Sequence, residues 1–412
     1  MSKTIIIGGG FVGLFTVLHL CHHKYPQSVT LIDQKDHFIF NPLLYELMTG
    51  EMTPDQVCPT YRELLKGSSA TFFEDQVDRI DLEQRKIYLS SDTHYDYDNL
   101  VLALGKKSGY FGIEGAENYA FPFRNRDDAL KLSQHLQKSL QKAGQTEEDK
   151  SRQRLLTFTI VGGGPTGIEM AGTLADLLYR WYSKIGGNLE EIKILLVSRP
   201  KELLKGDINA HLRDIVKKAF QHRPIKIDLI LGASVSKVTA STVEYQKEEE
   251  THSIETNTVI WAAGTQTNPL LRSLNIAPEN RAKNGSLHIL PTLQLPEYPN
   301  VFAAGDCIFQ SELHLPPTAQ VAYQQGKAIA NNLIAKVKGN SLKPAEVKLR
   351  GSMMKLGINE SAANIFDRFE VSGEVGHLIR EATYLELLPT PIHDFKVTTT
   401  WIIDEIFHRH SD

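Results

Sequence analysis

The sequence predicts an α/β protein with two parallel-sheet domains of similar design, and two glycine-rich stretches carry this prediction. The first, "IIIGGGFVGLF", occupies residues 5–15, and the second, "FTIVGGGPTGIEMAG", occupies residues 158–172. Each begins as an apolar strand, turns through a G-x-G-x-x-G pattern and continues with small and apolar residues at helical spacing. This order is typical of the phosphate-binding unit of a doubly wound (Rossmann-like) fold, because the helix N-terminus offers unpaired N–H groups to an anion.

The three glycines of each turn have different tasks. The first permits the tight turn, the second lets a pyrophosphate approach the backbone, and the third lets the helix pack closely on the strand. We therefore predict two dinucleotide sites. Their glycines are Gly8, Gly10 and Gly13 in the first turn and Gly162, Gly164 and Gly167 in the second.

The strand that follows the first turn supports this interpretation. "SVTLIDQ", residues 28–34, comes after a predicted helix. It contains Asp33, which lies about 20 residues after Gly13, at the spacing of a nucleotide-binding acid. A carboxylate at this place accepts hydrogen bonds from the adenosine ribose. A glycine-rich loop on an unrelated α/β sheet is the alternative, and the agreement of strand, glycines, helix and acid argues against it.

The second copy lacks this acid. Its following strand, "IKILLVSRP" at 192–200, places Ser198 at the position of Asp33 and Arg199 directly after it. A neutral hydroxyl and a guanidinium group suit a ribose 2′-phosphate, so we predict that NADPH is favoured over NADH. Three alternatives stay open: Arg199 points to solvent, the strand end is displaced by one residue, or both nucleotides are used.

Further strand-and-turn segments complete the pattern. "LVLALG" at 100–105 and "VIWAAG" at 259–264 run into small-residue turns, where the chain would pass close to a dinucleotide and cross between domains. "VFAAGDC" at 301–307 resembles the second flavin fingerprint of two-dinucleotide flavoproteins, in which an aspartate holds the ribityl chain. A helix predicted over 318–337 would point its positive N-terminal end at the flavin ring, so we assign FAD to the first turn and a nicotinamide nucleotide to the second. The predicted cofactor contacts in these segments are Ala103, Gly105, Gly264 and Asp306.

The composition excludes several other classes of protein. A length of 412 residues predicts two or three domains, and 41% hydrophobic with 23% charged residues is typical of a soluble globular protein. A net charge of −4 gives no indication of a nucleic-acid partner. No apolar run reaches the roughly 18 residues of a membrane span. The first strand begins near Thr4, which leaves no room for a signal peptide, so we expect a cytoplasmic protein.

The cysteines and histidines are not spaced for redox or metal chemistry. Cys21, Cys58 and Cys307 form no closely spaced pair, which fits a reducing compartment and excludes disulfide reductases and sulfide:quinone reductases. His22 and its neighbour His23 lack further ligands at suitable spacing, as does "HRH" near the C-terminus. We therefore expect no metal site.

The chain resembles one family of flavoproteins. The resemblance rests above all on "HFIFNPLLYELMTGEMTP" at 37–54 and "PPTAQVAYQQG" at 316–326, and also on "VGGGPTGIEMAG" at 161–172 and "GSMMKLG" at 351–357. These motifs are similar to those of the type II NAD(P)H dehydrogenases, the single-subunit NAD(P)H:quinone oxidoreductases. The resemblance covers about residues 4–360 and is weaker beyond them.

The resemblance implies a domain arrangement, a reaction and partners. It implies an FAD-binding domain at 1–120 and 270–345, an NAD(P)H-binding domain at 121–269 and a C-terminal segment at 346–412. A hydride would pass from NAD(P)H to FAD, and two electrons and two protons would then pass to a membrane quinone, without proton pumping. The family also implies peripheral contact with a membrane and a homodimer. Two alternatives stay open: reduction of a one-electron carrier protein such as a ferredoxin, and redox-responsive regulation with slow turnover.

Glu169 is the strongest candidate for a catalytic residue. It follows Gly167 by two positions in the first turn of the second phosphate-binding helix, where the first copy has Phe15. The helix dipole alone favours an acid there, but the same helix end must accept an anionic pyrophosphate. We predict that Glu169 packs on the nicotinamide or relays protons to the acceptor. The resemblance places this glutamate between nicotinamide, flavin and quinone.

The quinone pocket is predicted on the helix that begins at the flavin. Gln320 and Gln324 lie four residues apart and therefore on one face of this helix. The resemblance places both in the quinone pocket, where an amide can bind a quinone carbonyl, while a polar surface face is the alternative. Arg350 matches a usually basic position and would steady an anionic reduced quinone, unless it is simply solvated. Met353 would then line the pocket.

The C-terminal region is predicted to contain amphipathic helices. Residues 377–389 place Leu378, Ala382 and Leu385 at helical spacing, and 398–410 show a similar pattern. Their polar faces carry few Lys or Arg, so docking on the protein's own core and contact with a membrane surface are both consistent with the pattern. We predict peripheral membrane association. The polar stretch 141–153 is predicted to be an exposed connection.

Overall fold

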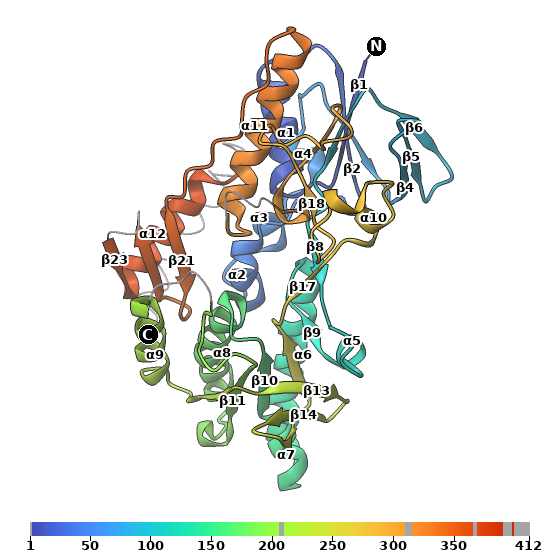
Figure 1. The fold of residues 1–412 in the computed structure, drawn as a ribbon. Helices are drawn as coiled ribbons and strands as arrows, with labels where there is room; N and C mark the ends of the chain where they lie inside the picture. Colours follow the sequence, from blue (N-terminus) through green and yellow to red (C-terminus); the bar gives the residue numbers. More distant parts are fainter. Residues whose placement is uncertain (1, 206–209, 310–314, 366–368, 390–397, 399–412) are drawn as a thin grey trace.

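The structure, a computed structural model, describes residues 2–205, 210–309, 315–365, 369–389 and 398. Two five-stranded sheets organise it, one in the upper part and one in the lower part of Figure 1. The predicted α/β fold with two similar parallel-sheet units is confirmed. The domain boundaries themselves stay predictions.

The first sheet has the strand order β19-β7-β1-β2-β3, and every neighbouring pair is parallel. Strand β19 comes from a distant part of the chain, so two stretches of sequence build this sheet. Helices α1 and α11 lie side by side, as both views show, and Thr16 Oγ1 donates to the Gly326 carbonyl at 3.1 Å. Because α1 is enclosed between the sheet and α11, it is apolar around most of its circumference. The bounds are β1 Lys3–Ile7, α1 Phe11–His22, β2 Ser28–Asp33, β3 Thr71–Glu74, β7 Asn99–Leu102, β19 Val301–Ala303 and α11 Ala319–Val337.

The second sheet repeats this arrangement with the order β12-β11-β10-β16-β9, again with parallel neighbours. In both sheets the strand that enters the glycine turn, β1 or β10, occupies the central position. The carboxyl end of such a strand is where ligands bind in doubly wound sheets. The bounds are β9 Phe121–Pro122, β10 Thr157–Val161, α8 Pro165–Lys184, β11 Lys193–Ser198, β12 Ile227–Leu231 and β16 Thr258–Trp261.

Two short strands carry the chain from one sheet to the other and back. β8 (Lys106–Ser108) and β17 (Thr265–Thr267) pair in antiparallel fashion. They follow the turns that contain Gly105 and Gly264, so the predicted crossing between domains occurs at these turns. Antiparallel three-stranded sheets flank the two units. Their strands are β4 Val77–Asp81, β5 Lys86–Leu89 and β6 His94–Asp96 in one, and β13 Ser234–Val238, β14 Thr242–Lys247 and β15 Glu250–Glu255 in the other.

The C-terminal part adds a small antiparallel sheet and a helix. β21 (Gly351–Lys355), β22 (Ser361–Ile365) and β23 (Phe369–Val371) form the sheet, and α12 (Gly373–Glu386) packs against β22. In Figure 1 this sheet lies beside α8 and α9, and the glycine at position 172 packs against the Leu356 carbonyl. The C-terminal part therefore contacts the second nucleotide-binding unit. The remaining helices are α2 Leu44–Thr49, α3 Pro54–Val57, α4 Tyr61–Leu64, α5 Ala116–Tyr119, α6 Arg126–Gln145, α7 Asp149–Leu155, α9 Ala210–Gln221 and α10 Pro269–Arg272.

Most predicted elements occur where the sequence places them. The polar stretch 141–153 is largely exposed, as predicted, but most of it is helical, because α6 continues to Gln145 and α7 begins at Asp149. Gln, Lys, Glu and Arg are good helix formers, so a polar composition alone did not indicate a loop. The predicted helix over 377–389 exists as α12. The segment 398–410 lies outside the described residues except for position 398.

Candidate functional site

The first glycine turn has the geometry that a pyrophosphate site requires. Gly8 has φ +98°, and any Cβ there would collide with the carbonyl oxygen of Ala103. A Cβ on Gly13 would collide with the carbonyl oxygen of Gly8, so only glycine lets α1 pack this closely on β1. Gly10 precedes α1 as its N-cap and has no atom within 4 Å of a Cβ. Open space therefore lies at the helix N-terminus.

The second turn repeats these relationships. Gly162 has φ +122°, and a Cβ there would lie 2.7 Å from the carbonyl carbon of Ala262. A Cβ on Gly167 would collide with the Gly162 carbonyl oxygen, as in the first turn. Gly164 is the N-cap of α8 and again faces open space. The two turns thus offer two equivalent anion sites at helix N-termini.

Asp33 lies at the end of β2 against the first turn. Its Oδ2 accepts a hydrogen bond from the Gly9 N–H at 2.6 Å, and its Oδ1 accepts from the Lys35 N–H at 2.9 Å. Burial raises the pKa of Asp33, and these N–H groups oppose the shift. Each carboxylate oxygen keeps a further acceptor position, so the group can bind ribose hydroxyls while it is held in place.

Asp306 lies in the short turn that follows β19, and two side chains that the sequence did not single out position it. The buried amide of Gln325 on α11 accepts the Gly305 N–H at 2.8 Å. Burial lowers the pKa of Arg124, and the charge of Asp306 opposes this shift. Gln325 directly follows Gln324 in the quoted motif, whereas no local pattern points to Arg124.

Ser198 and Arg199 lie where the second strand meets its glycine turn. Ser198 is buried, and its Oγ has no hydrogen-bond partner among the described residues. A Cβ on the neighbouring Gly163 would lie 2.5 Å from this Oγ, so the hydroxyl faces the turn directly. Arg199 is exposed beside it. The hydroxyl is thus enclosed beside the turn, and of the two side chains only Arg199 is exposed.

The turns at Ala103, Gly105 and Gly264 border the two glycine turns. Ala103 packs against Gly8, and Gly105 and Gly264 have φ values of +57° and +71°. The ring of Phe111 lies over Gly264 where a Cβ would stand. Phe111 itself has φ +53° and is 69% exposed, which is uncommon for a large aromatic residue. Phe111 was not predicted from the sequence as a site residue.

Glu169 is enclosed between three parts of the chain. Its Oε1 accepts the backbone N–H of Lys355 on β21 at 3.0 Å. The hydroxyl of Tyr45 on α2 faces it and donates to the carbonyl of Thr166 at 3.0 Å. Burial raises the pKa of Glu169, while Arg380, the Lys355 N–H and Tyr45 lower it. A carboxyl group whose pKa is raised by burial and which lies beside a tyrosine hydroxyl is a candidate for proton transfer.

A buried charge cluster that was not predicted from the sequence lies next to Glu169. It consists of Glu46, Glu51, Lys355 and Arg380. The Glu46 Oε1 accepts from Lys355 Nζ at 2.8 Å and from an Arg380 guanidinium nitrogen at 2.7 Å. Lys355 Nζ also lies 3.4 Å from Glu51 Oε2. A charged residue inside an apolar run, as in "YELM" and "MMKLG", was the available signal.

The residues predicted to bind quinone lie near one another. Hydrogen bonds from the two glutamine side chains to the backbone before β21, which the sequence did not indicate, hold them there. Gln324 accepts the Lys348 N–H at 2.9 Å and donates to its carbonyl at 3.0 Å. Gln320 accepts the Arg350 N–H at 3.3 Å. Met353 is half-buried on β21 and packs against the main core. Helix α11 therefore holds the segment that leads into β21.

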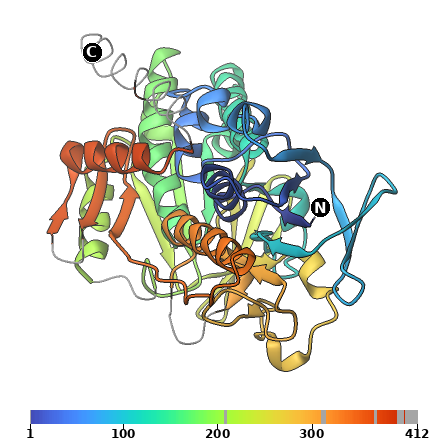
Figure 2. The same ribbon diagram turned by 90° about the horizontal axis from the view of Figure 1, so that it is seen from above.

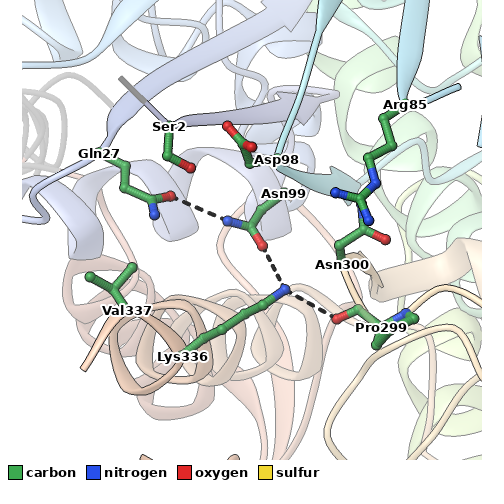
Figure 3. Close-up of a pocket in the computed structure, with 9 residues that line it drawn as sticks. All are labelled: Ser2, Gln27, Arg85, Asp98, Asn99, Pro299, Asn300, Lys336 and Val337. Carbon is green, nitrogen blue, oxygen red and sulfur yellow. Dashed lines mark hydrogen bonds between the residues drawn. The ribbon is translucent and has the colours of Figure 1, made fainter. Parts of the chain in front are cut away.

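Two cavities lie away from the glycine turns and from the residues described above. Figure 3 shows one of about 440 Å³, at the amino ends of β1 and β7, opposite the edge that carries the turns. Lys336 reaches into it and donates to Asn99 Oδ1 at 2.8 Å, so its polar groups largely bind one another. A second cavity, of about 290 Å³, lies between α1, α11 and the residues after α12. It is lined by Phe15, Leu18, His19, His22, Tyr323, Lys327, Leu388 and Pro389.

Other chemistry finds no support in the described parts of the chain. No group of three or more His, Cys, Asp or Glu able to hold a metal ion occurs among them. Burial raises the pKa of the Cys307 thiol to about 12, and the group donates to the Ala304 carbonyl at 3.0 Å, so it stays protonated. No helix in the described ranges is long and apolar enough to cross a membrane.

Comparisons with known proteins agree with this geometry. Residues 2–326 match the family model described as pyridine nucleotide-disulphide oxidoreductase. The chain is similar to demethylphylloquinone reductase NdbB of Synechocystis sp., with 32% identity over 97% of this chain and 95% of that protein. For the alternative NAD(P)H-ubiquinone oxidoreductase C1 of Arabidopsis thaliana the identity is 31% over 97% and 80%. For the type II NADH:quinone oxidoreductase Ndh of Mycobacterium tuberculosis it is 30% over 94% and 84%.

Solved structures share the fold. The structure of NDH2 from Plasmodium falciparum in complex with NADH superimposes with a TM-score of 0.86 at 21% identity, covering 98% of each chain. The sulfide:quinone oxidoreductase of Aquifex aeolicus gives a TM-score of 0.77 at 20% identity, over 99% of this chain and 96% of that one. At these identities the likeness supports the fold alone.

Proposed function

The chain belongs to the pyridine nucleotide-disulphide oxidoreductase family, within it to the type II NAD(P)H:quinone oxidoreductases, and from this premise we propose its reaction. It is an enzyme that passes a hydride from NADPH or NADH to FAD and then two electrons to a quinone, without proton pumping. The observation that carries the proposal is strand β21. At its start Arg350 is bound by Gln320, and at its end Lys355 binds Glu169.

The first glycine turn fits FAD. Gly8 and Gly13 are fixed by close packing, Gly10 leaves open space at the N-terminus of α1, and Asp33 is buried and held by backbone N–H groups. Asp306 stands where a ribityl chain would pass. Bound FAD supplies a ring that takes up two electrons as a hydride and gives them to an acceptor. The residues of this chain hold the pyrophosphate, the ribose and the ribityl chain.

The second turn fits a nicotinamide nucleotide, and the residues at the end of the adjoining strand β11 favour NADPH. The unpartnered Ser198 hydroxyl and the exposed Arg199 stand where an acid would otherwise repel a 2′-phosphate. Gly264 lies on the opposite side of this turn, under Phe111. The adenosine ribose would lie at Ser198 and the nicotinamide half toward Gly264.

Glu169 and the glutamine pair cannot act on one quinone ring at the same time. Their partners are Lys355 at the end of β21 and Arg350 directly before this strand. They are five residues apart, which corresponds to about 17 Å along an extended chain. We assign Glu169 to the nicotinamide side and to proton transfer toward the acceptor. Gln320, Gln324 and Met353 belong to the quinone side, where Arg350 would steady the reduced anion.

The membrane is the proposed source of the quinone. Leu378 and Ala382 on α12 are exposed, whereas Leu385 is half-buried and packs against the main core, so two of the three predicted stripe residues do not dock on the described core. We place the enzyme peripherally on the cytoplasmic face of a membrane through this stripe, as a homodimer.

Stopped-flow spectroscopy tests the reaction. NADPH should bleach the flavin absorption band, and a soluble naphthoquinone should restore it quickly. Fast reoxidation by a ferredoxin with slow reoxidation by quinone would instead establish the carrier-protein alternative. Slow reoxidation by every acceptor would establish the regulatory alternative.

A further inference from the structure

The buried charge cluster brings together three distant parts of the chain at a site that is shielded from solvent. Lys355, Arg380 and Glu46 are 0%, 1% and 5% exposed. They come from β21, α12 and α2, and a second Arg380 nitrogen donates to the Pro42 carbonyl at 2.7 Å. Removing ions from water costs free energy unless they are paired. The cluster is therefore stable only because its acidic and basic groups form ion pairs with one another.

The cluster is electrically almost balanced. Two acids, Glu46 and Glu51, face two bases, Lys355 and Arg380. Burial would raise the pKa of Glu46, but Arg380 and Lys355 outweigh it and hold this pKa at about 2. Burial likewise lowers the pKa of Arg380, and Glu46 more than restores it. Glu46 and Arg380 are therefore both charged at neutral pH.

Glu169 lies at the edge of this cluster, where a positive and a negative charge both act on its carboxyl group. Arg380 favours its carboxylate, whereas Glu46 disfavours it. Lys355 connects the two places physically, because its backbone N–H binds Glu169 while its Nζ binds Glu46. The titratable groups that act on Glu169 are Tyr45 and Glu46 from α2 and Arg380 and Tyr384 from α12. Lys355 of β21 binds Glu169 through its backbone, and its Nζ lies 3.4 Å from Glu51.

We propose that Glu46 and Arg380 are positioning residues whose opposite charges set the charge state of Glu169. The inference rests on the proton-transfer role proposed above for Glu169. It also gives the C-terminal helix a place in the reaction, because α12 must dock for Arg380 to reach Glu46. Neither residue touches substrate in this assignment.

Variants of the two residues should shift Glu169 in opposite directions. Glu46→Gln removes a negative charge and stabilises the Glu169 carboxylate, so the pH midpoint of turnover should fall by about one unit. Arg380→Gln removes a positive charge, so the midpoint should rise by about one unit. The double variant restores the balance and should return the midpoint close to that of the wild type.

Two readouts on the holoenzyme test the inference, and the second does not depend on activity. The first is the pH profile of turnover with NADPH and a soluble naphthoquinone. The second is the difference in Tm between each background with Glu and with Gln at position 169, followed against pH, which reports the titration of Glu169 directly. If the pH profile of turnover shows no midpoint for Glu169 but the Tm difference does, the proposed proton-transfer role of Glu169 is wrong. The pH dependence of the Tm difference then still tests whether Glu46 and Arg380 set the charge state of Glu169.

A matched control uses a second ionic contact, which joins α8, the helix of Glu169, to the turn between β21 and β22. Arg223 binds Asp176 of α8 at 2.7 Å and also binds Glu360. Glu360→Gln should lower Tm and leave both midpoints unchanged. Should the single variants of Glu46 and Arg380 not fold, Glu51→Gln, at a half-exposed position, should give a smaller downward shift. Equal or same-sign shifts in Glu46→Gln and Arg380→Gln, or no shift in Glu51→Gln, would overturn the proposal.

Discussion

Lys355 binds Glu169 through its backbone N–H at 3.0 Å and Glu46 through its side chain at 2.8 Å, so one residue joins the candidate proton carrier to a buried ion pair. The two bonds differ in kind. The first is directional and independent of the lysine side chain, and the second depends on charge. Substitutions of the acids should therefore have separable effects on activity and on stability.

Glu169→Gln should reduce turnover by about 100-fold, the usual contribution of a general acid or base. The amide still accepts the Lys355 N–H, so the fold should persist. Burial raises the pKa of Glu169 above its unfolded value, so its favourable effect on folding is complete below about pH 4 and is lost as pH rises through the folded pKa. The variant should therefore match the wild type in urea unfolding near pH 4 and exceed it at pH 8. Full activity in the variant would rule out the proton role.

Glu46→Gln should destabilise the protein in a way that depends on pH. Breaking one partner of a buried ion pair costs about 3–5 kcal/mol. The pKa of Glu46 is held at about 2, below its unfolded value, so its stabilising effect is present above about pH 4.3 and is lost as pH falls toward 2. Urea unfolding should show a large gap between wild type and variant at pH 7 that narrows toward pH 2. A gap that is constant with pH would contradict the assigned ion pair.

The sequence predicted the nucleotide turns well because their constraints are local. Gly13 and Gly167 meet the carbonyl oxygens of Gly8 and Gly162 only five residues away, so a short motif encodes the packing. The partner of Asp33, the N–H of Gly9, belongs to the same unit. Such features are visible in any stretch that contains strand, turn and helix.

The acceptor side could not be predicted in the same way, because its contacts join distant segments. Arg380 and Glu46 are separated by 334 positions, and neither lies in a periodic pattern that indicates the other. Gln320 and Gln324 were predicted as a pair on one face, but their amides bind the chain at 348–350, which no spacing reveals. Only the placement of β21 between α8 and α11 brings these groups together.

Two glycine substitutions in the second turn should separate binding from folding. Gly164→Ala points into open space at the N-terminus of α8, so Tm should change little while KM for NADPH rises at least about tenfold, because the methyl group occupies the phosphate position. Gly167→Ala would collide with the Gly162 carbonyl, so Tm should fall markedly. Thermal unfolding and steady-state kinetics of both variants check this. A stable Gly164→Ala enzyme with unchanged KM would show that the pyrophosphate binds elsewhere.

The nucleotide preference should depend on the end of β11. Arg199 is exposed at this strand end, so a 2′-phosphate can gain a charge-assisted contact of about 1.5–3 kcal/mol. This corresponds to about a ten- to hundredfold preference for NADPH in kcat/KM. Replacing both residues, Ser198→Glu with Arg199→Ala, introduces an acid that binds the ribose hydroxyls of NADH and repels the phosphate. The ratio of kcat/KM for the two nucleotides should then invert, while flavin reoxidation by quinone stays unchanged as the internal control. A wild-type enzyme that prefers NADH by tenfold, or a double variant with the original ratio, would show that this strand end does not select the nucleotide.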